Sequence, residues 1–269
     1  MAQFNSVYQR AFYYDIALKR DVSREVAFML ALYRHHTGRE MRSMLDIACG
    51  PGYHARTFAA RQVRAFGLDL RPEMVEFARD QAAAEGVEVN WLAADMRTFR
   101  LETPVDMAIC IFDGLDALLT NEEIIQHFRT VAANLSAGGL YLLEHTHPRY
   151  SSLQNYGAFR YEGKRDGVAV AINWATNNPT FHPVTGIAHV DIDMQITENG
   201  HAQTIHDTAQ ERLLSPQEIF LLAERSEALQ VVNWYGDFDL NQPLDNSPGS
   251  QRMITILQKM TGGGDDRTP

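Results

Sequence analysis

Acidic and glycine residues in the first part of the chain have the types and spacing of a ligand-binding turn. In the stretch 45–55, an apolar run that contains Asp46 leads into Gly50 and Gly52 and then into a helical pattern. The glycines allow a sharp turn and a close approach of a ligand to the main chain, and the following helix offers free N–H groups. Asp69 lies near the offset expected for a ribose-binding acid, so the two glycines also fit a dinucleotide fingerprint.

Two histidines further along the chain are candidate proton acceptors. His145 and His147 follow an apolar run, and the two-residue period of a strand sends both side chains to the same side. A neutral imidazole can take a proton near neutral pH. No third ligand with recognisable spacing accompanies them, so we expect no metal. The chain has 10 histidines, and a structural role is the alternative for each of these two.

An alternation of apolar strands and helical patterns must position these residues. Apolar runs predict strands at 43–49, 63–68, 87–93, 107–112 and 140–143. Pro72 starts a helix that Gly86 stops, and a capping box at 120–123 opens another. In an open parallel sheet, ligands bind at the carboxyl ends of the strands. Asp46, Asp69 and His145 therefore belong to one edge.

These landmarks together resemble those of class I S-adenosylmethionine (SAM)-dependent methyltransferases. Leu45, Asp46 and the two glycines match the first motif of that family, and Ala48 stands where the family often has its first glycine. The later landmarks are Asp69 after the second strand, 94–96 after the third, 105–106 before the fourth and 135–140 before the fifth. The resemblance covers roughly residues 44 to 146.

The resemblance implies a doubly wound Rossmann-like α/β fold with a seven-stranded sheet and SAM as the cofactor. It implies that Asp46 orders the methionine amino group and that Asp69 accepts from the ribose hydroxyls. Asp95 would accept from the adenine amino group, with Met96 against the ring. The alternatives are that Asp46 holds the amides of the turn, that Asp69 caps a helix and that Asp95 makes an Asx turn. The expected cofactor-binding residues are Asp46, Ala48, Gly50, Gly52, Asp69, Leu70, Asp95, Met96 and Phe112.

Segments outside the core complete the expected architecture. The N-terminal segment is aromatic-rich, so Tyr14 and Arg20 are candidate substrate-binding residues if it folds over the site; the alternative is an arm that packs on the core. Three period-two runs at 168–175, 187–197 and 202–213 predict an inserted antiparallel β-sheet. It would roof the acceptor pocket or build a dimer contact, and Trp174, with Asp113 after the fourth strand, is a further candidate for the substrate.

Five segments follow from these patterns. They are an N-terminal helical lid at 1–42, a SAM-binding core at 43–148, an inserted β cap at 149–214, the C-terminal part of the core at 215–260 and a flexible tail at 261–269. In the fourth, a helix precedes a hairpin whose last strand runs antiparallel to the sheet, which a dinucleotide dehydrogenase would not share.

Composition and charge exclude several classes of function. The formal net charge of −10 without a basic patch disfavours nucleic acid as a partner. Both cysteines lie in apolar segments, which disfavours disulfides, and no apolar run is long enough to cross a membrane. We therefore expect a cytoplasmic enzyme with no membrane partner, and homodimerisation stays open.

The expected activity is transfer of the sulfonium methyl of SAM to N or O of a small-molecule acceptor by in-line displacement, with His145 or His147 as the base. Three alternatives remain open at this level. The first is another use of SAM, such as intramolecular cyclisation or decarboxylation of an acceptor. The others are an NAD-dependent oxidoreductase and a binding protein without chemistry.

Overall fold

The fold is built on a mixed seven-stranded sheet with the order β12-β13-β5-β4-β1-β2-β3. The computed structural model describes residues 7–152, 155–156 and 158–260. The sheet strands are β1 (Ser43–Ile47), β2 (Arg64–Asp69), β3 (Val89–Ala93), β4 (Val105–Cys110), β5 (Leu135–Thr146), β12 (Leu229–Tyr235) and β13 (Arg252–Lys259). Strands β1 to β5 pair in parallel, and β13 pairs antiparallel to β5, as predicted.

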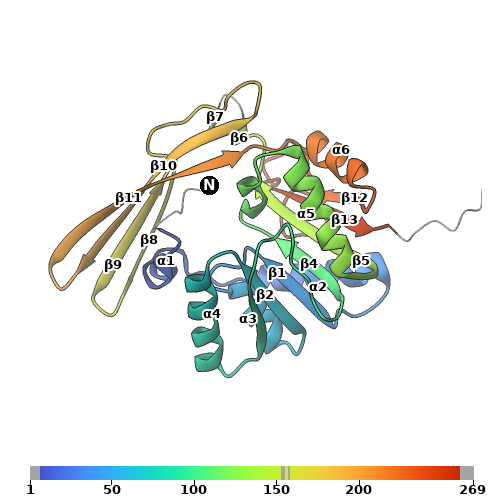
Figure 1. The fold of residues 1–269 in the computed structure, drawn as a ribbon, viewed down its shortest axis with the longest axis horizontal. Coiled ribbons are helices and arrows are strands. Elements are labelled where there is room, and N and C mark those ends of the chain that lie inside the picture. Colours follow the sequence, from blue (N-terminus) through green and yellow to red (C-terminus); the bar gives the residue numbers. More distant parts are fainter. Residues whose placement is uncertain (1–6, 153–154, 157, 261–269) are drawn as a thin grey trace, which may run out of the picture.

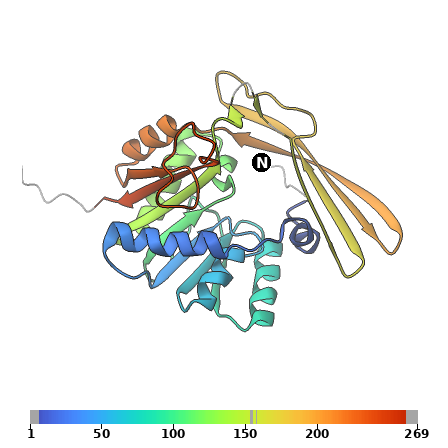
Figure 2. The ribbon, with the colours of Figure 1, turned by 180° about the vertical axis from the view of Figure 1, so that it is seen from behind.

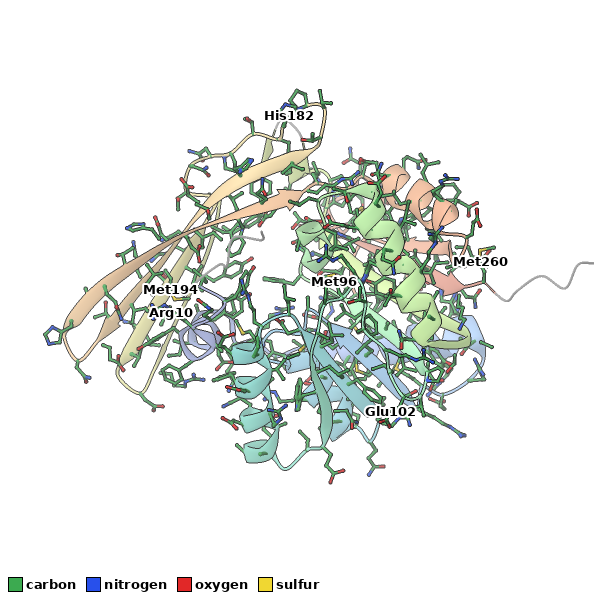
Figure 3. The ribbon with its side chains drawn as sticks, in the orientation of Figure 1. Arg10, Met96, Glu102, His182, Met194 and Met260 are labelled. Atoms are coloured by element: carbon green, nitrogen blue, oxygen red, sulfur yellow. The ribbon has the colours of Figure 1, made fainter. Side chains whose placement is uncertain are left out.

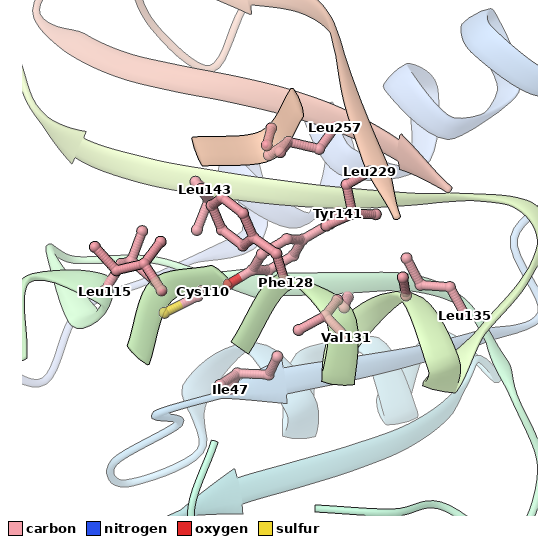
Figure 4. Close-up of a cluster of buried hydrophobic side chains, with 14 of the residues drawn as sticks. Ile47, Cys110, Leu115, Phe128, Val131, Leu135, Tyr141, Leu143, Leu229 and Leu257 are labelled. Carbon is pink, nitrogen blue, oxygen red and sulfur yellow. The ribbon is translucent and has the colours of Figure 1, made fainter. Parts of the chain in front are cut away.

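Helices cover both faces of this sheet (Figure 1). The core helices are α2 (Ser23–Thr37), α3 (Tyr53–Ala60), α4 (Pro72–Glu85), α5 (Asn121–Asn134) and α6 (Pro216–Ser226). On one face, Phe128 of α5 packs with Tyr141 and Cys110 in the cluster shown in Figure 4. On the other face, α2 and α3 bury Met29 and Phe58. Alternate residues of each strand supply the two faces, so this core fixes the register of every strand end.

Local signals in the sequence set the ends of several helices. Gly38 and Gly86 end α2 and α4 in the left-handed conformation, with φ of +68° in both. Thr120 and Ser215 form the capping boxes of α5 and α6. Strand β5 is longer than predicted, because the turn-like residues before 140 continue the strand. The predicted tail at 261–269 lies outside the described residues.

The insert is a separate antiparallel sheet with the order β11-β10-β9-β8 (Figures 1 and 2). Its strands are β8 (Phe159–Arg165), β9 (Val168–Trp174), β10 (Ile187–Glu198) and β11 (His201–Arg212), and the two-residue strands β6 (Ser151–Ser152) and β7 (Asn155–Tyr156) precede them. The prediction of three strands missed β8. In β8, aromatic residues and a glycine alternate with charged residues. The strand therefore lacks the continuous apolar run from which its partner β9 was predicted.

The expected lid at 1–42 divides into two helices with different contacts. Helix α2 belongs to the core, as described above, whereas α1 (Ala11–Leu18) packs on the insert and shares its apolar cluster with Val170 and Ile192. The backbone of α1 lies directly on β8, since a Cβ atom added to Gly163 would stand 1.9 Å from the carbonyl oxygen of Ile16. Helix α1 and the antiparallel sheet therefore form one packed body.

We expect Gly163→Ala to destabilise the protein. The added methyl group has no space against the main chain of α1, and overpacking of this kind costs about 1–3 kcal/mol of unfolding free energy. Urea unfolding of the variant, with Lys164→Ala on the exposed side of the same strand as the control, measures this cost. Equal midpoints for Gly163→Ala and the wild type would contradict the close contact.

Candidate functional site

The turn between β1 and α3 lies at the centre of the candidate site. Ala48, Gly50 and Gly52 all have left-handed backbones, with φ of +55°, +51° and +77°. A Cβ atom on Gly50 would meet no described atom within 4 Å, whereas one on Gly52 would collide with the Trp91 ring. Gly50 therefore leaves the main chain open to a ligand, and Gly52 lets the turn pack on the core.

A cleft opens over this turn and encloses about 440 Å³ of empty space, open solvent included. It brings together residues from the core and from the N-terminal segment. The lining residues are Tyr14, Leu18, Arg20, Asp46, Ala48, Cys49, Gly50, Pro51, Tyr53, His54, Ile111 and Phe112. Six residues predicted for cofactor or substrate thus share one cleft, among them Tyr14 and Arg20 of the N-terminal segment.

Asp46 is the one acid among the described lining residues, and it is 2% exposed. Burial raises the pKa of Asp46 to about 6, while nearby His54 and the backbone N–H of Ala55 lower it. His54 Nε2 lies 2.5 Å from Glu25 Oε2, which also pairs with Arg20. Asp46 therefore both holds a backbone amide and places a negative charge at the bottom of the cleft.

Asp69 lies beside the glycine turn but outside the lining of the cleft. Its carboxylate accepts hydrogen bonds from the backbone N–H of Gly50 and of Arg71, both at 2.9 Å. Burial is the main cause that raises the pKa of Asp69. The N-cap of α4 is Arg71, which has no side-chain cap bond, so Asp69 holds two turn amides and does not cap the helix; a carboxylate has about four acceptor positions and can accept from a ligand as well. Leu70, the next residue, is 56% exposed.

Asp95 and Met96 form the turn after β3. Asp95 makes the Asx turn with the Arg97 N–H and also pairs with the Arg97 guanidinium at 2.6 Å, which lowers its pKa. The carbonyl of Met96 accepts from buried His127 at 2.9 Å, if that nitrogen carries the proton. In Figure 3, Met96 lies on the side of the core that faces the antiparallel sheet. Both residues thus stand at the expected edge, and Arg97 is a partner that the sequence did not reveal.

The turn after β4 is strained and is held by buried Glu144, which pairs with the partly buried Arg252. Phe112 and Asp113 both have φ of +59°, a conformation that L-residues rarely adopt. Glu144 accepts from the Phe112 N–H at 2.6 Å and pairs with Arg252. Asp113 accepts from the N–H and hydroxyl of Thr146. Both oxygens of the Asp113 carboxylate are therefore used to stabilise the turn. Its predicted contact with substrate stays a proposal.

The two candidate bases have different surroundings. Both ring nitrogens of His147 bond to the main chain, Nε2 to the Asp245 carbonyl at 2.9 Å and Nδ1 to the Arg149 N–H at 3.0 Å. His145 is 3% exposed, and neither of its ring nitrogens has a hydrogen-bond partner among the described residues. Burial lowers the pKa of His145 to about 4, so its ring is neutral near pH 7. We keep His145 alone as a candidate for chemistry.

The insert contributes an aromatic and acidic wall. Trp174 donates its indole N–H to Glu211 at 2.7 Å, and Tyr156 donates its hydroxyl to the same carboxylate. The rings of Tyr14, Tyr8 and Trp174 follow one another at centroid distances of 5.6 and 6.1 Å. This row leads from Tyr14 of the cleft to Trp174 and its partner Glu211, and the predicted contact of Trp174 with substrate stays a proposal.

The sequence did not reveal Asp116, Glu211 or Arg252 as site residues. Asp116 lies in the one-turn helix η1 (Gly114–Ala117) directly after the strained turn, and its spacing from Asp113 is the only local signal. Glu211 sits among alternating polar residues of β11, which read as a solvent-facing edge. Only the path of β11 over the end of the core brings it to the site.

The cleft fits SAM by the chemistry of its donors and acceptors. The open space beside Gly50 admits a ligand to the main chain, Arg20 offers a cation to a carboxylate, and Asp46 offers an anion to an ammonium group. Among the described residues, no group of three or more His, Cys, Asp or Glu side chains has metal-binding geometry. Within the same residues, no helix is long and apolar enough to cross a membrane.

Comparison with known proteins agrees with this geometry. Residues 44–139 match a family model described as a methyltransferase domain. A SAM-dependent methyltransferase from Clostridium acetobutylicum superposes with a TM-score of 0.75 over 94% of this chain and 99% of its own, at 15% sequence identity. The predicted resemblance to class I SAM-dependent methyltransferases and the predicted fold are confirmed.

Two curated relatives act on amino sugars. The dTDP-4-amino-2,3,4,6-tetradeoxy-D-glucose N,N-dimethyltransferase of Saccharopolyspora spinosa is 30% identical over 148 residues, 53% of this chain and 57% of its own. The dTDP-3-amino-3,4,6-trideoxy-alpha-D-glucopyranose N,N-dimethyltransferase of Streptomyces venezuelae is 30% identical over 125 residues, 46% of this chain and 51% of its own. The matched part of the chain thus spans little more than half the length of these relatives.

We expect Asp46→Asn to stabilise the ligand-free protein near neutral pH. The fold raises the pKa of Asp46 from 3.8 to about 6, so the wild type loses stability as the pH rises through this range. Removing the charge should raise the free energy of unfolding by up to about 3 kcal/mol above the range and by nothing below it. Denaturant unfolding at several pH values, with exposed Asp80→Asn as the control, measures the difference; a gain that is the same at all pH values would contradict this origin.

Proposed function

We propose that this chain, whose residues 44–139 match a methyltransferase domain, transfers the methyl group of SAM to a nitrogen atom of a small-molecule acceptor. The observation that carries the proposal is the cleft over the glycine turn, where cation, anion and open main chain meet. The cleft adjoins an acidic wall formed by the insert. The names of the two curated relatives extend the proposal to an amino sugar, free or linked to a nucleotide.

The cofactor half of the proposal assigns the methionine part of SAM to residues of the cleft and the adenosine part to the neighbouring strand ends. SAM would supply a methyl group bound to a positively charged sulfur. The lone pair of the acceptor attacks the methyl carbon in line with the C–S bond, and the sulfur is the leaving group. Arg20 binds the carboxylate of the methionine part, and Asp46 binds its ammonium group. Asp69 accepts from the ribose hydroxyls, and the 95–96 turn receives the adenine. The chain thus fixes the cofactor at both ends, which leaves the position of the acceptor to decide the rate.

The acceptor half places the amine between the cleft and the insert. Phe112 lines the cleft and packs on Tyr161 of β8 at a centroid distance of 5.7 Å, and the guanidinium of Arg20 lies 4.9 Å from the Phe112 ring centroid. Tyr14, Tyr8 and Trp174 form the adjoining aromatic side. An acceptor enclosed by these rings loses water, and the carboxylates beyond them attract a cationic nitrogen.

The first test is incubation of the protein with SAM and amino sugars, both free and linked to dTDP, followed by mass spectrometry. We expect mono- or dimethylated amine together with S-adenosylhomocysteine, and no turnover of the corresponding hydroxy sugars. SAM that is consumed without acceptor would identify another use of SAM. Binding of NAD⁺ without binding of SAM in calorimetric titrations would overturn the proposal.

We expect Asp69→Ala to weaken SAM binding by about tenfold or more, because it removes a charge-assisted hydrogen bond to the cofactor. Because Asp69 accepts from Gly50 through Oδ2 and from Arg71 through Oδ1, Asp69→Asn can keep only one of these two bonds, and the urea midpoint of each variant therefore separates loss of the ribose contact from loss of the turn. Calorimetry with SAM measures the affinity, with Asp80→Ala as the control. An unchanged affinity in both Asp69 variants would remove this residue from the site.

A further inference from the structure

Two buried groups beyond the cofactor cleft lack hydrogen-bond partners and face each other. Asp116 Oδ1 and both ring nitrogens of His145 are buried without a partner among the described residues. The Oδ1 atom lies 3.5 Å from His145 Nε2, within ion-pair distance but without a hydrogen bond. Leaving such groups unsatisfied is costly, so the arrangement points to a missing donor between or beside them.

The charges around this pair are negative. Asp113 and Glu144 share the guanidinium of Arg252, so this cation pairs with two other carboxylates and forms no ion pair with Asp116 among the described residues. Glu211, brought over from the insert, has only the neutral donors of Tyr156 and Trp174. Burial, followed by the charges of Asp113 and Glu211, raises the pKa of Asp116 well above its ordinary value, whereas Arg252 lowers it.

These surroundings indicate which kind of ligand group would bind between Asp116 and His145. A metal ion is disfavoured, because no metal-binding cluster is found in the described part of the chain. A hydroxyl offers one donor and no charge, so it would leave the carboxylates uncompensated. An ammonium group offers three donors and one positive charge, which matches Asp116, the neutral His145 ring and Glu211.

We propose that Asp116, supported by His145 and Glu211, binds the acceptor as an ammonium group and takes the proton that this group must lose before methyl transfer. This assignment rests on the proposed function and names the residue that makes an amine the acceptor. Asp116 lies four residues after Phe112 of the cleft, and the aromatic row ends at Glu211 on its other side. Its side chain is 14% exposed, so the proton can leave to solvent.

The proton and electron balance follows directly. One proton passes from the ammonium nitrogen to the Asp116 carboxylate, which leaves a neutral amine and a carboxylic acid. The amine lone pair then forms the new N–C bond while the C–S bond breaks, and the bonding pair stays on the sulfur of S-adenosylhomocysteine. The product is again an ammonium ion, and Asp116 returns its proton to solvent. The same cycle can repeat on a monomethylated amine.

The binding test compares two pairs of probes, and the members of each pair differ only in the reacting group. Protein saturated with S-adenosylhomocysteine is titrated with dTDP-3-amino-3,6-dideoxyglucose, with dTDP-6-deoxyglucose and with both sugars free of nucleotide. We expect an amine to bind about tenfold or more tighter than its hydroxyl counterpart. Asp116→Asn and Glu211→Gln should each reduce this preference, whereas Asp80→Asn, an exposed change of the same chemistry, should keep it.

The kinetic test separates proton transfer from a structural role. For Asp116→Asn we expect kcat to fall at neutral pH and to recover as the pH approaches the pKa of the free amine, because solvent then supplies the neutral nucleophile. A loss of kcat that is independent of pH would overturn the role of proton acceptor. Absence of S-adenosylhomocysteine binding would overturn the proposed function. If that binding is intact, equal binding of amine and hydroxyl probes, or no binding of either, would overturn the assignment of Asp116.

Discussion

The partly buried pair of Glu144 and Arg252 is the interaction on which the rest of the site depends. It joins the end of β5 to the antiparallel strand β13, and Glu144 at the same time anchors the Phe112 N–H. This anchor, together with the bonds of Asp113 to Thr146, holds two consecutive left-handed residues, and the turn that they form fixes where Phe112 and Asp116 lie. The last strand of the chain thus controls the geometry of a turn that precedes it by more than a hundred residues.

The cofactor side of the site could be predicted from the sequence because its residues are close to one another along the chain. Asp46, Gly50 and Asp69 follow buried strands, and strand ends of a parallel sheet meet at one edge. Helix ends at Gly38 and Gly86 were equally local, since a left-handed cap favours glycine. The apolar period of the sequence predicted these elements because each helix or strand must bury one of its own faces, whatever its neighbours are.

The acceptor side could not be predicted in the same way, because it depends on contacts between distant segments. In the sequence, Glu211 has the pattern of a surface residue, and only the position of β11 beside the core brings it near the site. The sequence likewise gives no sign that Arg97 pairs with Asp95. His145 and His147 are equivalent by strand period, yet the loop that carries Asp245 binds only one of them. Strand β8 escaped detection since its alternating charges resemble those of an exposed segment.

Helix α1 has a second consequence for the molecule, beyond its place at the cleft. Asp15, 1% exposed, ties it to Tyr53 after the glycine turn and to Arg165 of β8. Its apolar face also covers Val170 and Ile192, which would otherwise face water on an antiparallel sheet. Loss of α1 would therefore expose an apolar face of the antiparallel sheet and would also open the cofactor cleft on one side. The same helix thus lines the cleft and keeps an apolar sheet face out of water, so a substitution that loosens α1 exposes a surface of the kind that promotes aggregation.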